Sequence, residues 1–229
     1  MDNEEKRKQR GWVDKTALDA YNGATIEEML SLLTATDPQK RTIAAHLLPL
    51  SCETANILLD AFSHESALYT RLALAEKLEK GDGKIAEKML PYLASIGNNQ
   101  HRVPVQPSHK KSFPLPRDLI ARSLGRMDPT IFPVLMDSLA TLSVTKLREV
   151  IDAIGYLAFY NPAVATDAHY DRLLQLRKTY KEDTLIQWKL IICFSAFPQS
   201  RSLLLEESVF AAEAQRSLKL LTKKESSSR

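Results

Sequence analysis

The stretch Asp37–Leu48, DPQKRTIAAHLL, contains the pattern that decides the fold. An aspartate is a favoured N-cap, and a proline directly after it is tolerated because the first turn of a helix leaves its N–H groups unpaired. Counted from Arg41, Ala44 lies at +3, Ala45 at +4 and Leu48 at +7. Residues at these spacings share one face of a helix. The stretch therefore predicts an amphipathic helix that begins at the Asp-Pro pair.

The same spacing returns further along the chain. Copies start at Arg71 and Arg117, and a looser copy starts at Leu147, with Arg148 one position out of register. A second apolar pattern alternates with this one, with residues at i, i+3, i+4 and i+7. Its copies begin at Ile26, Ala55, Ala86 and Phe132. Two alternating helical signals predict pairs of an A helix and a B helix, and neighbouring pairs are expected to stack and share one core.

The leucine at +7 of each clear B helix should be buried, which applies to Leu48, Leu78 and Leu124. Beyond Asn161 the pattern weakens, and we expect a helix pair at 170–181 and 185–197 and a final helix at 203–221. Weak terminal units are typical of repeat proteins, where they cap the array. The sequence predicts one domain over residues 12–221, a charged N-terminal tail at 1–11 and a C-terminal tail at 222–229.

The block Asp37–Leu48 and its echo at Arg117–Gly125 resemble the short bacterial HEAT-like repeats, including those of the family named after phycobilisome lyases. The resemblance covers roughly residues 25 to 160. It implies an all-α fold, a right-handed α-solenoid of stacked helix pairs (a HEAT/ARM-like superhelix) with the B helices lining the concave side. Function does not follow from such a fold.

Composition narrows the class of protein. Hydrophobic residues make up 44% and charged residues 26% of 229 residues, as in ordinary globular chains. The net charge of +3 is weaker than in most dedicated nucleic-acid binders. Two cysteines are too few for a disulfide scaffold. The N-terminus lacks the apolar core of a signal peptide, and no apolar stretch is long enough to span a bilayer, so we expect a cytoplasmic protein without membrane association.

A long insertion separates the third A and B helices. Residues 97–116 contain four prolines, which prevent helix formation, and the whole stretch 88–117 contains no acidic residue. Loops of this length in compact repeats are functional or disordered. We expect it to bind a partner or anion, with a merely solvated insertion as the alternative. The candidate binding residues are Arg102, His109, Lys110, Lys111, Phe113 and Arg117, with Phe113 as an exposed apolar anchor.

The repeat arginines Arg41, Arg71 and Arg117 allow two interpretations. They could form a basic ladder on the concave face, or they could donate hydrogen bonds between adjacent repeats, as the matching arginine tends to do in HEAT proteins. The sequence favours the second, structural interpretation.

Two motifs were weighed as sites for chemistry. His64-Glu65 is similar to the iron-binding pairs of HEAT-type deoxyhypusine hydroxylases, but a lone pair cannot complete a metal shell. Trp188 is similar to the aromatic side chains that HEAT-like alkylpurine DNA glycosylases use, but it lies among apolar residues and is expected in the core. No nucleophile elbow or phosphate-binding loop is present in the sequence. We expect no cofactor and no metal.

These observations favour a non-catalytic interaction or scaffold module over an enzyme. The expected partner is a protein with an acidic segment, or another anion, bound through the concave face and the basic loop. The alternative is a DNA-binding or DNA-repair protein of the HEAT-like glycosylase type. A continuous positive stripe and strongly salt-dependent affinity would be typical of that alternative.

Overall fold

The computed structural model describes residues 3–227, with side chains described to residue 223, and this part of the chain is helical with no β-strand. The expected all-α class is therefore confirmed. Six helices form the first members of successive pairs: α3 (Ile26–Leu33), α5 (Cys52–His64), α7 (Gly83–Met89), α9 (Phe132–Ser138), α11 (Asp167–Thr179) and α13 (Arg201–Glu206). The second members are α4 (Pro38–Leu47), α6 (Leu68–Leu78), α8 (Leu119–Arg126), α10 (Val144–Tyr160), α12 (Thr184–Phe194) and α14 (Ala211–Ser227).

Short elements precede and connect these pairs. Two helices lie before the first pair, α1 (Asn3–Lys8) and α2 (Lys15–Asp19). Single 3₁₀ turns complete the list: η1 (Leu90–Tyr92), η2 (Pro129–Ile131), η3 (Pro162–Val164) and η4 (Pro198–Ser200).

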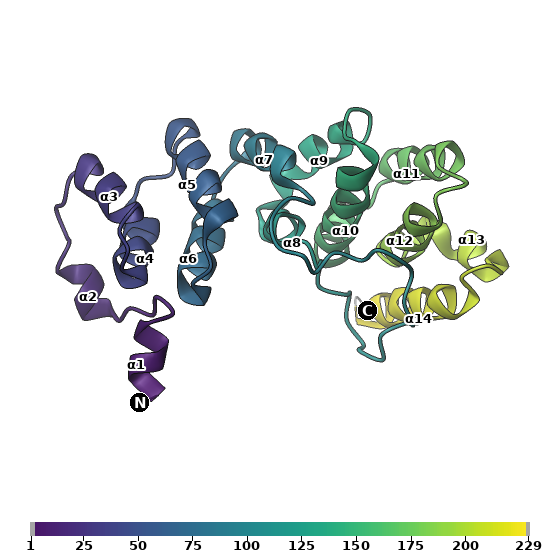
Figure 1. Ribbon diagram of the computed structural model, residues 1–229. Helices are drawn as coiled ribbons and strands as arrows, with labels where there is room; N and C mark the ends of the chain where they lie inside the picture. The colour runs from purple at the N-terminus through teal and green to yellow at the C-terminus, as the bar shows by residue number, and fades with distance from the viewer. Residues whose placement is uncertain (1–2, 228–229) are drawn as a thin grey trace.

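Each pair packs against the next one along the chain (Figure 1). The second helices form an unbroken row in which α4 contacts α6, α6 contacts α8, and the contacts continue through α10 and α12 to α14. The first helices α5, α7 and α9 contact one another in the same order. Neighbouring pairs thus share one core, because a single helix hairpin cannot bury its apolar face by itself.

Side-chain caps fix where several helices begin. The predicted start of α4 is confirmed, since the Asp37 carboxylate accepts a hydrogen bond from the backbone N–H of Gln39, with Pro38 in the first turn. Thr25 and Ser51 form capping boxes at α3 and α5. Each cap gives an otherwise unpaired N–H group an acceptor, which stabilises the helix by about 1 kcal/mol.

The predicted buried positions of the second helices are confirmed. Leu48, Leu78 and Leu124 are all fully buried. Ala45 and Ala121, at +4 in their helices, are fully buried as well, and their small side chains let neighbouring helices approach closely. The +3/+4/+7 spacing therefore gives the correct buried face of α4 and α8.

The C-terminal region differs from the prediction of one helix over 203–221. It forms two helices, α13 and α14, separated by a turn. The Glu207 carboxylate accepts hydrogen bonds from the backbone N–H groups of Val209 and Phe210, and it also pairs with Arg177 of α11. Because the Glu207 side chain accepts these N–H groups in place of a backbone carbonyl, α13 ends here and α14 begins.

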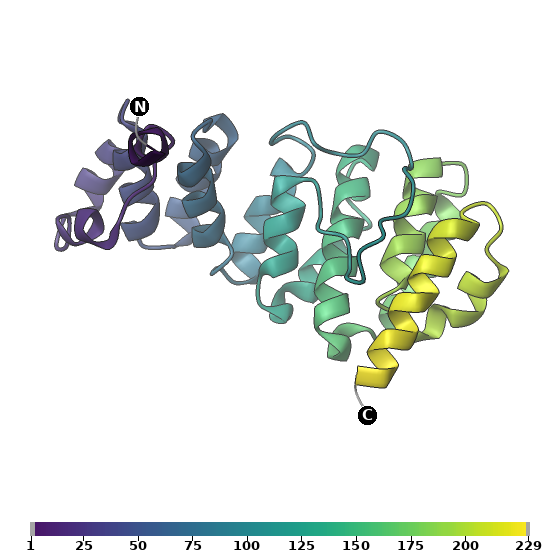
Figure 2. The same cartoon turned by 90° about the horizontal axis from the view of Figure 1, so that it is seen from below.

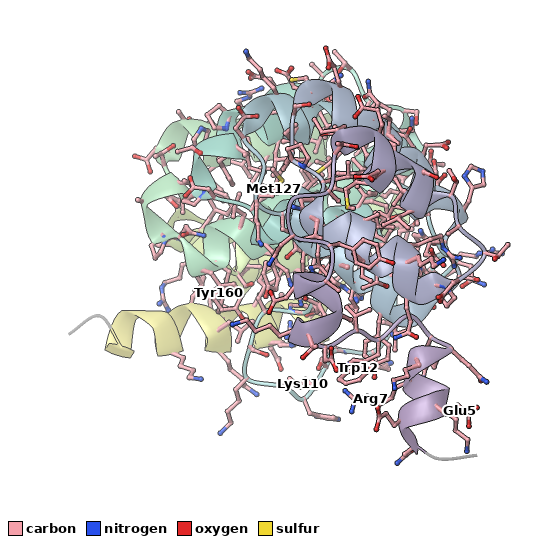
Figure 3. The ribbon with its side chains drawn as sticks, turned by 90° about the vertical axis from the view of Figure 1, so that its left-hand side faces the viewer. Glu5, Arg7, Trp12, Lys110, Met127 and Tyr160 are labelled. Carbon is pink, nitrogen blue, oxygen red and sulfur yellow. The ribbon has the colours of Figure 1, made fainter. Side chains whose placement is uncertain are left out.

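The predicted tails contain more structure than expected. Residues of the N-terminal segment form the exposed helix α1, and the Arg7 guanidinium lies 4.2 Å from the centre of the Trp12 ring (Figure 3). The carbonyl of Arg10 accepts a hydrogen bond from the N–H of Tyr69 on α6. At the other end α14 continues to Ser227. Aromatic stacking and the backbone hydrogen bond give a charged segment fixed contacts that its composition does not indicate.

Candidate functional site

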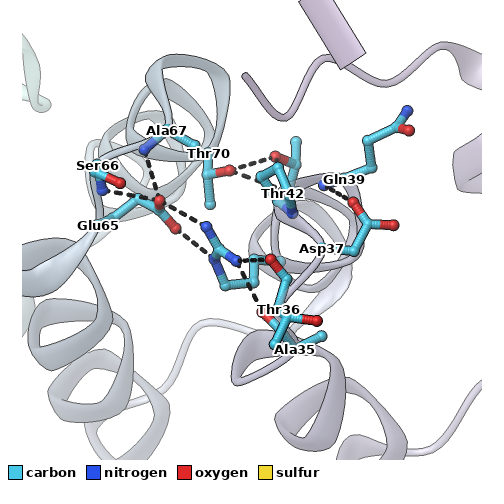
Figure 4. A network of polar contacts seen from close by, with 11 residues as sticks. Ala35, Thr36, Asp37, Gln39, Thr42, Glu65, Ser66, Ala67 and Thr70 are labelled. Atoms are coloured by element: carbon cyan, nitrogen blue, oxygen red, sulfur yellow. Dashed lines mark hydrogen bonds and ion pairs between the residues drawn. The ribbon is translucent and has the colours of Figure 1, made fainter. Parts of the chain in front are cut away.

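Arg41 connects two successive helix pairs. Its guanidinium donates hydrogen bonds to both oxygens of Glu65 at 2.7 and 2.9 Å, and to the carbonyls of Ala35 and Thr36 (Figure 4). Glu65 lies directly after α5, where its carboxylate also accepts the N–H groups of Ser66 and Ala67. A two-pronged contact of this kind fixes the angle between neighbouring pairs.

The other two repeat arginines do not form such a contact. Arg117 is exposed and precedes α8, whose N-cap is the buried Asp118, so the arginine does not open the helix as the sequence pattern implies. Arg71 is half-buried and has no ion pair among the described residues. The equivalent connection further along is Arg148 of α10, which pairs with Asp183, the N-cap of α12, at 2.6 Å. Because Arg148 is shifted by one position from the repeat pattern, the sequence did not indicate this role.

The insertion loop, residues 97–116, crosses the row of second helices. It runs out over α10 to α14 and returns to α8 (Figures 1 and 2). It begins at Gly97, whose φ of +78° lies in the left-handed region that favours glycine. The loop therefore lies on the face formed by the second helices.

Phe113 anchors this loop inside the protein rather than presenting an apolar group to a partner, as the sequence had suggested. Its side chain is 4% exposed and packs with Leu185, Trp188 and Ile192 of α12. Its ring also lies edge-on to Tyr156 of α10, with 6.1 Å between the ring centres. The loop aromatic thereby covers apolar side chains of α10 and α12.

Arg216 of α14 holds the outer part of the loop. The guanidinium donates hydrogen bonds to the carbonyls of Ser108 and Ser112 at 2.9 and 2.8 Å. It also pairs with Glu213 at 3.1 Å, and the Glu213 carboxylate accepts a hydrogen bond from the Trp188 side chain. The loop conformation is thus set by a buried charged group, which makes its surface a preformed one.

A basic groove lies between the loop and α14, with a volume of about 720 Å³. The loop contributes one wall and α14 the other, and none of the described residues that line it is acidic. Figure 3 shows Lys110 on the loop where it passes next to α14. The cationic side chains and the histidine of this basic groove are His109, Lys110, Lys111, Arg216, Lys219 and Lys223.

Only part of the predicted binding set lines this groove. His109, Lys110 and Lys111 do so, whereas Arg102 and Arg117 are exposed outside it and Phe113 is buried. The three groove residues of α14 were missed by the sequence analysis. A signal for them existed, since positions 216, 219 and 223 are separated by three and four residues and share one helix face.

A buried cluster of charges lies beneath the same loop. Lys189 of α12 is fully buried and donates hydrogen bonds to Glu149 at 3.0 Å and Asp152 at 2.9 Å, both on α10. The second oxygen of Glu149 has no hydrogen-bond partner among the described residues. Nearby, His101 of the loop lies edge-on to Trp188 with 4.9 Å between ring centres. One cation facing two carboxylates leaves a surplus negative charge in a dry environment.

Burial, more than this surplus charge, decides which group takes up a proton. Burial raises the pKa of Glu149 to about 7, an effect that the charge of Lys189 only partly offsets. Burial alone would lower the pKa of Lys189, but Asp152 and Glu149 outweigh it and the lysine pKa rises. Lys189 is therefore charged throughout the physiological range, and Glu149 is the group that titrates.

We expect this titration to lower stability as the pH rises. A carboxyl with a pKa raised from 4.5 to about 7 contributes stability below 4.5 and loses it as the pH passes through 7. Glu149→Gln keeps an acceptor for Lys189 but cannot ionise. Between pH 5 and 8 the unfolding free energy of this variant should rise relative to that of the native protein by about 1–3 kcal/mol. Denaturant melts across pH measure it, and parallel curves would contradict the assignment.

The two motifs considered as chemical sites, His64-Glu65 and Trp188, make ordinary structural contacts. Glu65 is bound by Arg41, and the neighbouring His64 side chain is 78% exposed and contacts Asp60 of its own helix. Trp188 is 3% exposed. Among the described residues no three histidine, cysteine or carboxylate side chains come close enough together to hold a metal ion.

Comparison with known proteins gives no relative. No family model matches the chain, and no curated protein and no solved structure matches it either. Among residues 3–227 no helix has both the length and the apolar composition needed to cross a membrane.

Proposed function

We propose that this protein is a non-catalytic interaction module which binds an acidic protein segment in the basic groove. The observation that carries the proposal is the groove itself, where cationic side chains from two distant parts of the chain line one hollow and none of the described lining residues is acidic. Surface cations are normally interspersed with carboxylates, so a hollow lined by one sign of charge attracts the opposite charge.

The proposed architecture is a right-handed HEAT-like α-solenoid with the second helices on its concave side. Support comes from the unbroken row of second helices and from Arg41, which connects neighbouring pairs as a HEAT arginine does. In this arrangement the insertion loop fills part of the concave side and replaces it as the binding surface. A cytoplasmic location is part of the same proposal.

Rigidity favours this site over a mobile loop. Arg216 fixes two carbonyls of the loop, and Phe113 is seated in the core, so little conformational entropy is lost when a partner binds. Lys110 and Lys111 are exposed, and their ammonium groups are positioned to attract an anion from solution. Such charges act mainly on the association rate, with a range of about 8 Å at physiological salt.

The test compares two triple variants with equal loss of charge. In the groove variant, Lys110, Lys111 and Lys219 are replaced by serine; in the control, Lys40, Lys84 and Lys178, exposed lysines outside the groove, are replaced. The probe is a fluorescent hexaglutamate peptide followed by stopped flow. The groove variant should associate about tenfold more slowly at low ionic strength, with an unchanged melting temperature. Equal rates for both variants would contradict the proposal.

DNA binding is the second candidate function, since phosphates would be attracted by the same groove. The experiment therefore includes a labelled single-stranded oligonucleotide of similar charge. Tighter binding of the oligonucleotide than of the peptide, with a steep dependence on salt, would favour the DNA-binding or DNA-repair alternative.

A further inference from the structure

A second hollow, of about 530 Å³, also has Pro107 of the loop in its lining. It is lined largely by apolar groups, including Pro104, Val105, Val209 and Phe210. Val105 is 47% exposed and Val209 is 80% exposed. Exposed valines that gather at a hollow, rather than lying singly on the surface, are typical of an interaction site.

The apolar hollow and the basic groove lie next to each other. Gln106, Pro107 and Ala212 line both of them. The apolar part lies at the start of α14, beside Val209 and Phe210, and the basic part extends along α14 to Lys219 and Lys223. The combined surface is therefore mainly apolar at one end, where the buried Glu213 that pairs with Arg216 also lines it, and cationic at the other.

The apolar end is held in a fixed shape. The Glu207 carboxylate accepts hydrogen bonds from the N–H groups of Val209 and Phe210, so the turn before α14 has a defined backbone. Phe210 packs against the cluster of Phe113 and Trp188. A preformed apolar pocket gains affinity from burial without first ordering its own walls.

We propose that the combined groove binds an extended acidic peptide segment that carries one bulky apolar side chain beside its carboxylates. This inference rests on the proposed function and names the chemistry of its ligand. The distance along α14 from Ala212 to Lys223 is about 16 Å at the helical rise per residue, which about five extended residues span. The apolar side chain fills the hollow at Val105 and Val209, and the carboxylates contact Lys110, Lys111 and Lys219.

Two halves of different chemistry select this ligand. The cationic half by itself would accept any anion, including a phosphate chain. The apolar half adds burial of hydrocarbon, which a phosphate backbone cannot supply and an acidic peptide with an apolar residue can. The groove then selects peptides in which the apolar side chain and the carboxylates lie within about five residues of each other.

The experiment compares three fluorescent peptides in equilibrium binding: hexaglutamate, Phe-Glu5 and Glu5-Phe. One of the two phenylalanine peptides, depending on the direction in which the chain lies, should bind about tenfold more tightly than hexaglutamate. The apolar variant replaces Val105 and Val209 with serine and should abolish this gain while leaving hexaglutamate binding unchanged. The control variant replaces Leu205 with serine as well. Leu205 is an apolar residue that is 69% exposed and lies outside both hollows.

The outcomes separate the two proposals. If hexaglutamate binds through the lysines but phenylalanine adds nothing at either end, or if the apolar variant keeps the gain, the further inference is overturned and the proposed function stands. If no peptide binds, or if hexaglutamate binding is the same in the groove variant, the proposed function fails and the inference fails with it. Displacement of every peptide by a single-stranded oligonucleotide at lower concentration would also overturn the inference.

Discussion

Replacing Lys189 with methionine is expected to destabilise the protein by about 3–5 kcal/mol near pH 8, although the two side chains are similar in size. Lys189 is fully buried and is the cation that faces both Glu149 and Asp152. Removing it leaves two carboxylates in contact with apolar surroundings, without a compensating charge. The cost comes from the unpaired carboxylates rather than from lost attraction, because desolvation of ions largely cancels the attraction within a buried pair. Urea melts at fixed pH measure this loss.

The variant's pH dependence distinguishes an electrostatic cause from a packing defect. Glu149, whose pKa is about 7 even beside Lys189, should protonate at higher pH in the variant, so the loss should shrink toward pH 5. Adding Glu149→Gln to the lysine variant should restore part of the stability near pH 8. Lys178→Met, at an exposed position of α11, is the matched control and should change stability by no more than about 0.5 kcal/mol. A loss that is equal at both pH values would contradict the explanation.

Truncation of Phe113 to alanine is expected to cost about 3–5 kcal/mol of stability, as for other buried phenylalanines. The ring fills the pocket between α10 and α12, and the fit is close. A β-carbon added to Gly155 of α10 would lie 2.6 Å from the tip of this ring and 3.0 Å from the backbone of Cys193. The glycine is therefore needed for both the close approach of the helices and the seat of the ring.

The sequence-based hypothesis that Phe113 contacts a partner is therefore replaced. In the structure the truncation should lower the melting temperature and loosen the loop, and the loss of partner binding should follow from that. Leu115→Ala is the control within the same loop, since Leu115 is 42% exposed. If Phe113→Ala left the melting temperature unchanged, Phe113 would not be an anchor of the loop.

The helices were largely predictable because their signals are local. The buried faces of α4 and α8 follow from spacings within eight residues, and the start of α4 follows from the Asp37-Pro38 pair. Where the ends of a helix depend on other elements, the prediction failed. The break between α13 and α14 requires Glu207, whose carboxylate is oriented partly by Arg177 of α11, and no local pattern reports that contact.

The candidate site was predictable in part for the same reason. The run of prolines and the absence of acidic residues identified the loop and its residues His109, Lys110 and Lys111. The second wall of the groove could not be assigned, because Arg216 lies more than a hundred positions from the loop carbonyls that it binds. The separations along the chain for these two hydrogen bonds are 108 and 104 residues.

The amino-acid sequence by itself determined that this chain is helical, that its helices alternate in two patterns, and that one long basic loop interrupts them. These properties follow from backbone preferences and from the periodicity of apolar residues, which act over one or two helical turns. Only the tertiary structure decided that Phe113 faces inward, that α14 completes the basic groove, and that Lys189 is buried between two carboxylates. The direction of a side chain and the balance of buried charges depend on which distant helices meet, and that is set by the packing of the whole chain.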